Sequence, residues 1–267
     1  MALTQADCTS LANVYDATQG TSFTITLSAA LGASRLGLVH IIAQSQANVD
    51  PSLTSVVMSG ITMTQHSTTS LSTFQRQYIY RCLDAAASGT SLVLTYANTQ
   101  NNVRAHTVEW ANVKTSGTNG ADALAQAVVR NTGTSTTPSA TLGSAPATNN
   151  GVMGWYAAAV GAGGGGVLTV GTDFTVKGPT DMSTNPKMTS EAAAGSAVGD
   201  GVADATTGNS IAWYMYVLEI AEASAGGAAA RRRREFVSLA FLTAPAIEAF
   251  GRIFARRNSG LLAPVGA

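Results

Sequence analysis

The feature that most constrains the fold of this chain is a recurrent alternation of short apolar runs and turn-forming clusters. From Phe23 onward, runs rich in Val, Ile, Thr, Tyr and Leu are separated by Gly, Asn, Ser and Pro at intervals of about ten residues. No helical period persists between the runs, which argues against a parallel sheet with crossover helices. The pattern is typical of an antiparallel sandwich, and 267 residues are enough for a sizeable core.

Two segments support this interpretation most strongly. SVVMSGITMTQ predicts two strands joined by a tight turn at Ser59 and Gly60, because glycine supplies the positive φ that hairpin turns need. SIAWYMYVLEI is apolar on both alternating faces, as expected of a central strand covered on both sides. The expected strands are residues 23–27, 36–43, 55–58, 62–65, 76–83, 91–97, 104–110, 124–129, 152–160, 167–170, 174–177, 187–192 and 211–220.

We therefore predict an all-β fold: an antiparallel double-sheet jelly-roll-like sandwich with a C-terminal extended arm containing two short helices. The arm begins where the composition changes, after Ile220, in the sequence AEASAGGAAARRRR. The predicted parts are a β-sandwich body over residues 1–222, a Gly/Ala/Arg linker over 223–234 and an amphipathic helical arm over 235–267. Apolar residues at helical spacing on either side of Pro245 indicate the two helices.

Charge is scarce and unevenly distributed. Only 11% of residues are charged, against about 25% in ordinary soluble domains. Residues 1–230 carry eight Lys/Arg and thirteen Asp/Glu, a net charge of −5, whereas residues 231–267 carry seven Arg and two Glu, a net charge of +5. Such asymmetry indicates an interaction tail. An acidic protein surface, an anionic membrane and nucleic acid all attract a basic segment, so charge alone leaves the partner open.

The arm supplies the predicted partner-binding residues. Its four consecutive arginines either solvate a linker or pair with phosphates or with carboxylates on a neighbouring subunit. Nucleic-acid recognition usually adds aromatic stacking or a wider basic surface, which the acidic body does not supply, so a protein partner is favoured. The predicted partner-binding residues are Arg231, Arg232, Arg233, Arg234, Phe236, Phe241, Phe250, Phe254, Arg256 and Arg257.

Motifs for enzymatic chemistry are weak throughout the sequence. Residues 161–166 satisfy GxGxxG, but a strand-like segment follows where a dinucleotide-binding fold needs a helix, so a hairpin loop is favoured. Cys8 and Cys82 match no disulfide, zinc or redox spacing, and Cys82 is expected to be a small buried hydrophobe. No Walker A, GxSxG or HExxH motif occurs. We predict no enzymatic activity, no cofactor and no metal.

The isolated ionisable and aromatic residues have structural interpretations. His40, His66 and His106 lack metal-ligand spacing, and His40 lies in an apolar run, where a hydrogen-bonded core histidine is expected. Glu109 and Glu219 are expected at a solvated strand edge or beside an arginine, rather than as a glycosidase pair. The tryptophans are expected in the core, although a sugar-stacking platform remains an alternative.

Residues 20–221 resemble virion structural proteins of tailed bacteriophages. The resemblance lies in the segments GTSFTITL, SVVMSGITMTQ, RQYIYRCLDAAASGTSLVLTY and WYMYVLEIA. The likeness is to jelly-roll capsid decoration (cement) proteins and tail-associated sandwich proteins. It implies a non-catalytic homo-oligomer in the virion whose partners are major capsid or other virion proteins. The N-terminus has no secretory signal pattern, so synthesis in the host cytoplasm is expected. Nucleic acid is disfavoured, and a membrane is a weaker alternative partner for the arm. The alternative function is a carbohydrate-binding tail or fibre domain using exposed aromatics.

Overall fold

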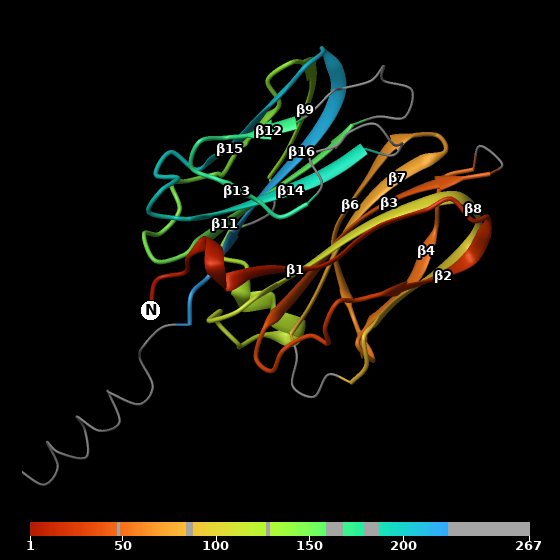
Figure 1. The fold of residues 1–267 in the computed structure, drawn as a ribbon, viewed down its shortest axis with the longest axis horizontal. Helices are drawn as coiled ribbons and strands as arrows, with labels where there is room; N and C mark the ends of the chain where they lie inside the picture. The colour runs from red at the N-terminus through yellow and green to blue at the C-terminus, as the bar shows by residue number, and fades with distance from the viewer. Residues whose placement is uncertain (47–48, 84–87, 127–128, 159–167, 179–186, 224–267) are drawn as a thin grey trace, which may run out of the picture. The chain divides into compact units, whose positions relative to one another are not determined.

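The computed structural model of the chain describes residues 1–46, 49–83, 88–126, 129–158, 168–178 and 187–223 (Figure 1). The predicted helical arm, all ten predicted partner-binding residues and the GxGxxG segment lie outside the described residues. Residues Met1–Ala223 form one compact unit. Its described part is built from antiparallel strands and two short 3-10 helices, which confirms the all-β prediction.

The strands divide into two consecutive sets, which we call the first half (residues 1–113) and the second half (residues 114–223). The first half contains η1 (Gln5–Asp7), β1 (Cys8–Asp16), β2 (Gly20–Thr26), β3 (Leu36–Ser45), β4 (Leu53–Met58), β5 (Ile61–Thr62), β6 (Thr64–Ser72), β7 (Gln75–Leu83) and β8 (Ser91–Trp110). The second half contains η2 (Thr118–Ala123), β9 (Val129–Ser135), β10 (Ser139–Thr141), β11 (Gly151–Ala158), β12 (Leu168–Val170), β13 (Thr175–Val176), β14 (Lys187–Ala194), β15 (Val202–Thr207) and β16 (Ile211–Ile220).

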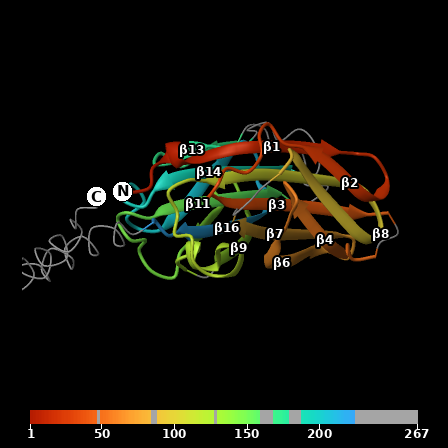
Figure 2. The same cartoon turned by 90° about the horizontal axis from the view of Figure 1, so that it is seen from below.

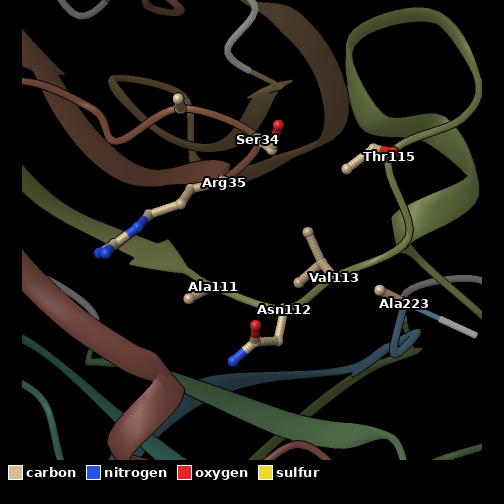
Figure 3. A pocket seen from close by; sticks show the side chains of 8 residues that line it. Ser34, Arg35, Ala111, Asn112, Val113, Thr115 and Ala223 are labelled. Atoms are coloured by element: carbon tan, nitrogen blue, oxygen red, sulfur yellow. The ribbon is translucent and has the colours of Figure 1, made fainter. Parts of the chain in front are cut away.

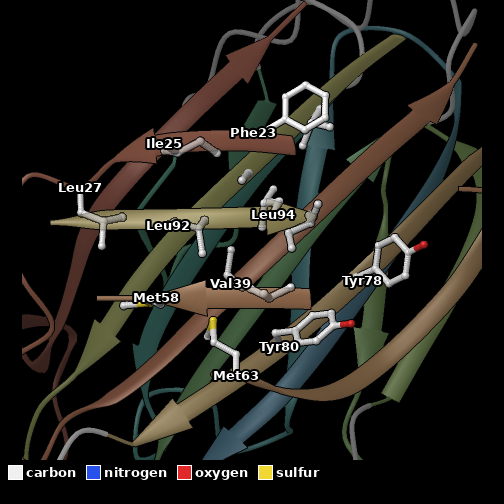
Figure 4. Close-up of a cluster of buried hydrophobic side chains, with 14 of the residues drawn as sticks. Phe23, Ile25, Leu27, Val39, Met58, Met63, Tyr78, Tyr80, Leu92 and Leu94 are labelled. Carbon is white, nitrogen blue, oxygen red and sulfur yellow. The ribbon is translucent and has the colours of Figure 1, made fainter. Parts of the chain in front are cut away.

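In the first half, one long strand belongs to two layers. The C-terminal part of β8 lies between β1 and β3, in an inner sheet of order β1-β8-β3-β7-β6. The N-terminal part of β8 lies between β2 and β4, in an outer sheet that ends at β5. The sheet therefore curls over itself and encloses a core that includes Phe23, Val39, Tyr80 and Leu94 (Figure 4).

The second half repeats this arrangement in the same chain order. Its inner sheet has the order β9-β16-β11-β14-β13, and its outer sheet has the order β10-β15-β12. Strands β9 through β14 thus correspond, in chain order, to β1, β2, β3, β4, β6 and β7. The N-terminal part of β8 corresponds to β15 and its C-terminal part to β16. A second core, which includes Val152, Tyr156 and Trp213, lies between these two sheets. The sequence interpretation did not predict this duplication.

The registers define which residues are equivalent in the two halves. Leu36 pairs with Trp110 in the first half, and Gly151 pairs with Ile220 in the second. At the same strand position, His40 pairs with His106 and Trp155 pairs with Tyr216. Equivalent residues are those that occupy the same place in these ladders.

The inner sheets of the two halves pack against each other (Figure 2). Leu38, Ile79 and Trp110 of the first half share one apolar cluster with Trp155 and Leu218 of the second half. His40 stacks on its own equivalent, Trp155, with ring centroids 5.1 Å apart and an interplanar angle of 8°. Contact between equivalent residues is the mark of a two-fold interface, so the halves form a pseudo-dimer within one chain.

Several detailed predictions can be checked against these strands. Ser59 and Gly60 both have positive φ, at 51° and 82°, and join β4 to β5, as predicted. β16 contributes to the clusters on both of its faces, which confirms the central strand. The predicted strands 91–97 and 104–110 are one continuous strand, because inner and outer sheets share β8. The expected strand 124–129 is wrong for most of its described length: Leu124 forms an isolated bridge with Ile220, and β9 begins at Val129.

Candidate functional site at the base of the body

The described chain ends at Ala223, and main-chain hydrogen bonds fix this position. Val113 and Glu222 form an antiparallel bridge, in which Lys114 N donates to Ala221 O at 3.0 Å and Ala223 N donates to Asn112 O at 2.7 Å. Asn112 and Glu222 are equivalent, as are Val113 and Ala223. The chain ends that leave the two halves therefore pair with each other, and we call the surface around them the base.

A pocket with a volume of about 390 Å³ opens at the base (Figure 3). Two of its residues, Ser34 and Asn112, have left-handed backbones, with φ of 58° and 57°. Non-glycine residues adopt this conformation at a cost, and such positions gather at functional sites. Residues lining the pocket include Ser34, Arg35, Asn112, Val113, Thr115 and Ala223.

The charges around the pocket are largely matched. Arg35 forms an ion pair with Glu109, which also accepts a hydrogen bond from Gly32 N at 2.9 Å. Asp7 accepts hydrogen bonds from Asn112 Nδ2 at 2.7 Å and from the amide and hydroxyl of Thr4. Burial alone raises the pKa of Asp7, but these hydrogen bonds outweigh it and lower the pKa. The pocket is thus a recess of mixed polar and apolar lining whose charges are paired.

The corresponding place in the second half is filled. Asn149 is equivalent to Ser34; its carbonyl accepts a hydrogen bond from Leu3 N at 2.8 Å. Glu222 accepts hydrogen bonds from Asn149 Nδ2 and from the N-terminal amine of Met1. The N-terminal residues thus occupy in the second half the place that stays open in the first. The base is asymmetric at the point where the chain continues beyond Ala223.

Both buried glutamates occupy equivalent positions and hold equivalent loops. Glu109 binds Gly32 N and Arg35, whereas Glu219 binds Ala147 N at 2.7 Å and Asn150 Nδ2 at 2.6 Å. Glu219 is also bonded to Gln126 Nε2 and is 3% exposed. The expectation of an arginine partner is confirmed for Glu109, but the expected solvated edge is wrong for both glutamates. Their oxygens hold the loops that precede β3 and β11.

The two inner-sheet histidines lie within the interface between the halves. His106 Nδ1 is 2.8 Å from Ser190 Oγ, and its Nε2 is 3.2 Å from Ser10 Oγ. Burial lowers the pKa of His106 to about 4. His40 is hydrogen-bonded to Gln77, which confirms the expected core histidine. Both rings are fully buried; the His106–Ser190 bond connects the two halves, whereas the bonds to Ser10 and Gln77 connect strands within the first half.

The remaining candidates are structural in the described part of the chain. All three tryptophans are buried, as expected, and among the described residues Tyr15 is the one large exposed aromatic. Cys82 is fully buried, also as expected, and burial raises the pKa of Cys8 to about 12. No group of three or more potential metal-ligating side chains occurs among the described residues. Nor does any described helix have the length and hydropathy needed to cross a membrane.

Sequence patterns gave little or no signal for two of these features, the pocket and the equivalence of the two glutamates. The pocket combines loops that lie almost eighty residues apart or more, so no local motif marks it. The equivalence of Glu109 and Glu219 had a faint signal in the similar segments VEWA and LEIA. Comparison of the chain with protein-family models, with curated proteins and with solved structures finds no match.

Proposed function

We propose that this protein is a non-enzymatic structural component of a virion, which decorates or cements a tailed-bacteriophage capsid through oligomer contacts and its basic C-terminal arm. The observation that carries the proposal is the repeated strand order of the two halves. We interpret this repeated strand order as jelly-roll-like, an architecture common in viral capsid and lectin domains. We accordingly interpret the body as two jelly-roll-like sandwiches rather than the single one expected.

The buried polar groups of the body support the proposal of a structural rather than a catalytic role. Glu109 and Glu219 hold loops, and the His106 and His40 rings connect strands in the interface. Buried hydrogen bonds of this kind favour one rigid conformation of the body. A rigid body suits a protein that must present the same surface in every copy of an assembly.

The base supports attachment through the arm. The chain leaves the body from a hydrogen-bonded position at Ala223, beside Asp7 and Glu222. The segment that follows carries a net charge of +5, against −5 in residues 1–230. Opposite charges steer association and fix register. We therefore propose that residues 231–257 bind a neighbouring copy or another virion protein, such as the major capsid protein.

Particle binding tests this function. The full chain and a chain ending at Ala225 are each incubated with purified particles that lack the protein, and bound protein is measured by co-sedimentation. We expect the shortened chain to bind at least tenfold more weakly. A full-length variant in which Arg231–Arg234 are replaced by glutamine separates charge from length and is expected to lose the salt-sensitive part of the binding. Equal binding by all three proteins would contradict the proposed attachment.

The carbohydrate-binding alternative has less support, because its platform needs exposed aromatic rings. Trp110, Trp155 and Trp213 are buried, which leaves Tyr15 as the large exposed aromatic of the described residues. Glycan binding that is lost in a Tyr15→Ala variant would favour this alternative. Flotation of the isolated arm with anionic liposomes would favour the membrane alternative instead.

A further inference from the structure

The outer sheet of the first half has one long free edge. β2 has seven residues and pairs with β8 alone in the described part of the chain. The other outer-sheet edges are short, because β5 has two residues and β10 and β12 have three each. Natural proteins usually protect a sheet edge with a short strand, a charge, a proline or a bulge, since an unpaired edge can bind another strand. β2 carries neither a charge nor a proline, and its bulge is confined to its start, between Gly20 and Ser22.

Hydrogen bonding to β8 leaves alternate residues of β2 free to pair. Leu27 N donates to Thr90 O at 2.9 Å, in the same register as the ladder between β2 and β8. Because hydrogen-bonded pairs alternate in an antiparallel ladder, Phe23 and Ile25 also bond to β8. The residues whose main-chain N–H and C=O groups point away from β8 are therefore Ser22, Thr24 and Thr26.

The side chains of β2 alternate strictly along this free stretch. Phe23 and Ile25 point into the first-half core beside Leu92 and Leu94 (Figure 4), and each is 3% exposed. The exposed residues of the stretch all carry hydroxyl groups; they are Ser22, Thr24 and Thr26. On either side of Thr24 the strand therefore continues with one large apolar residue and then one hydroxyl-bearing residue. This symmetry allows the stretch to match a reversed copy of itself.

We propose that β2 pairs antiparallel with β2 of a second copy of this chain, about a two-fold axis at Thr24. In this register Thr24 lies opposite its own counterpart and Ser22 lies opposite Thr26, so each free N–H faces a free C=O. Phe23 lies opposite Ile25 on the covered face of the sheet. Pairs of Thr with Thr or Ser across an antiparallel ladder add to its stability. The outer sheets of the two copies thus form one continuous sheet.

The absence of charge favours a second copy as the partner. The described strands of this outer sheet, which are β2, β4, β5 and residues 91–100 of β8, contain no Asp, Glu, Lys or Arg. A charged edge that meets its own copy brings like charges together, whereas this edge meets its copy without repulsion. In the second half, by contrast, the exposed Asp204 lies on β15, the central strand of the outer sheet. The contact is one of the oligomer contacts of the proposed function and rests on that proposal for its role, although dimerisation itself is measurable on the isolated protein.

Sedimentation velocity of the isolated full chain at ~1 M NaCl tests the pairing, because this salt screens contacts of the basic arm but not those of an uncharged strand pair. We expect the wild-type protein to form a dimer. Thr24→Lys places two ammonium groups directly opposite each other and should raise the dissociation constant of the dimer about tenfold. Thr141→Lys, at an exposed position on the equivalent short strand β10, is the matched control and should leave the constant unchanged. A wild-type protein that is monomeric at about 100 μM, or a dimer that Thr24→Lys does not weaken, would overturn the proposal.

Disulfide cross-linking tests the register of the pairing. The Cα atoms of a hydrogen-bonded antiparallel pair lie about 5.5 Å apart, which suits a disulfide. Thr24→Cys should therefore form a covalent dimer with oxidised glutathione, whereas Thr141→Cys should not; Cys8 and Cys82 are buried. A covalent dimer that fails to bind particles would support the pairing and contradict the proposed function. If Thr24→Cys instead cross-links to another virion protein on particles and not to itself, a strand of that protein occupies the edge and the proposal is wrong.

Discussion

The two halves of the body share a strand order and a register but fill equivalent positions with different chemistry. His40 corresponds to Trp155, Arg35 to Asn150, and Tyr80 to Glu191. The ladders tolerate these exchanges because main-chain hydrogen bonding sets the topology, whereas side chains need only fill the space between layers. The difference teaches that either half can bury a polar residue where the other has an aromatic one: His40 does so in the first half, opposite the equivalent Trp155, and Glu191 does so in the second.

The stack of His40 on Trp155 offers the largest effect with which to test this comparison. Trp155→Ala should lower the free energy of unfolding by about 4 kcal/mol, because it opens a cavity where the two inner sheets meet. His40 is the equivalent residue and has a smaller ring, so His40→Ala should lower the free energy of unfolding by only about 2 kcal/mol. Urea unfolding measures both values. Equal losses would show that the two sides of the stack contribute alike.

The equivalent glutamates provide the next test. Glu219→Ala leaves Ala147 N and the side chain of Asn150 without their acceptor in a buried site, at a cost of about 3 kcal/mol. Glu109→Ala should cost about 2 kcal/mol, because the Arg35 side chain is 39% exposed and water can solvate it. Asp122→Ala, at an exposed ion pair with Lys114, serves as the control and should change stability by less than ~0.5 kcal/mol. A larger loss for Glu109 than for Glu219 would contradict the comparison.

The buried interface histidine predicts acid sensitivity. The pKa of His106 is about 4 in the folded protein and near 6.5 in the unfolded chain, because burial disfavours the charged ring and Arg104 adds to this. Between these values the unfolded chain binds more protons, so stability is full above pH 6.5 and falls as the pH drops. The part of the loss that comes from His106 should reach about 2 kcal/mol by pH 5. His106→Gln should reduce the slope measured by urea unfolding between pH 7 and 5 without removing it, because burial also lowers the pKa of His40; an unchanged slope would exclude His106 as a contributor.

The smallest expected effect concerns the β4–β5 hairpin, which has no described counterpart in the second half. Gly60 has a φ of 82°, and Gly60→Ala should cost about 1 kcal/mol because an L side chain strains this conformation. Ser59→Gly relieves the positive φ of 51° but removes the hydroxyl that accepts a hydrogen bond from Leu31 N, so it should also cost about 1 kcal/mol, for a different reason. Thermal unfolding measures both losses, and a Gly60→Ala variant as stable as the wild type would contradict the requirement for glycine in this turn.

Local patterns predicted the strands whose residues alternate or are uniformly apolar. β3, β7 and β16 were expected because aliphatic and aromatic residues dominate them. β1 was missed because CTSLANVYD mixes small and polar residues, and neighbouring strands rather than intrinsic preference hold it in the sheet. The candidate pocket was not predictable, since loops remote in sequence form it.

The sequence by itself determined the all-β class, the hairpin at Ser59 and Gly60, the doubly covered strand β16 and the charge contrast between body and arm. These features depend on period, turn chemistry and composition, which are local properties of the chain. Only the tertiary structure decided that the body is a duplicated pair, that Glu109 and Glu219 play one role, and that the carboxyl oxygens of Glu191 are buried without a hydrogen-bond partner among the described residues. Equivalence and burial are relations between distant residues, and the packing of the sheets is what creates them.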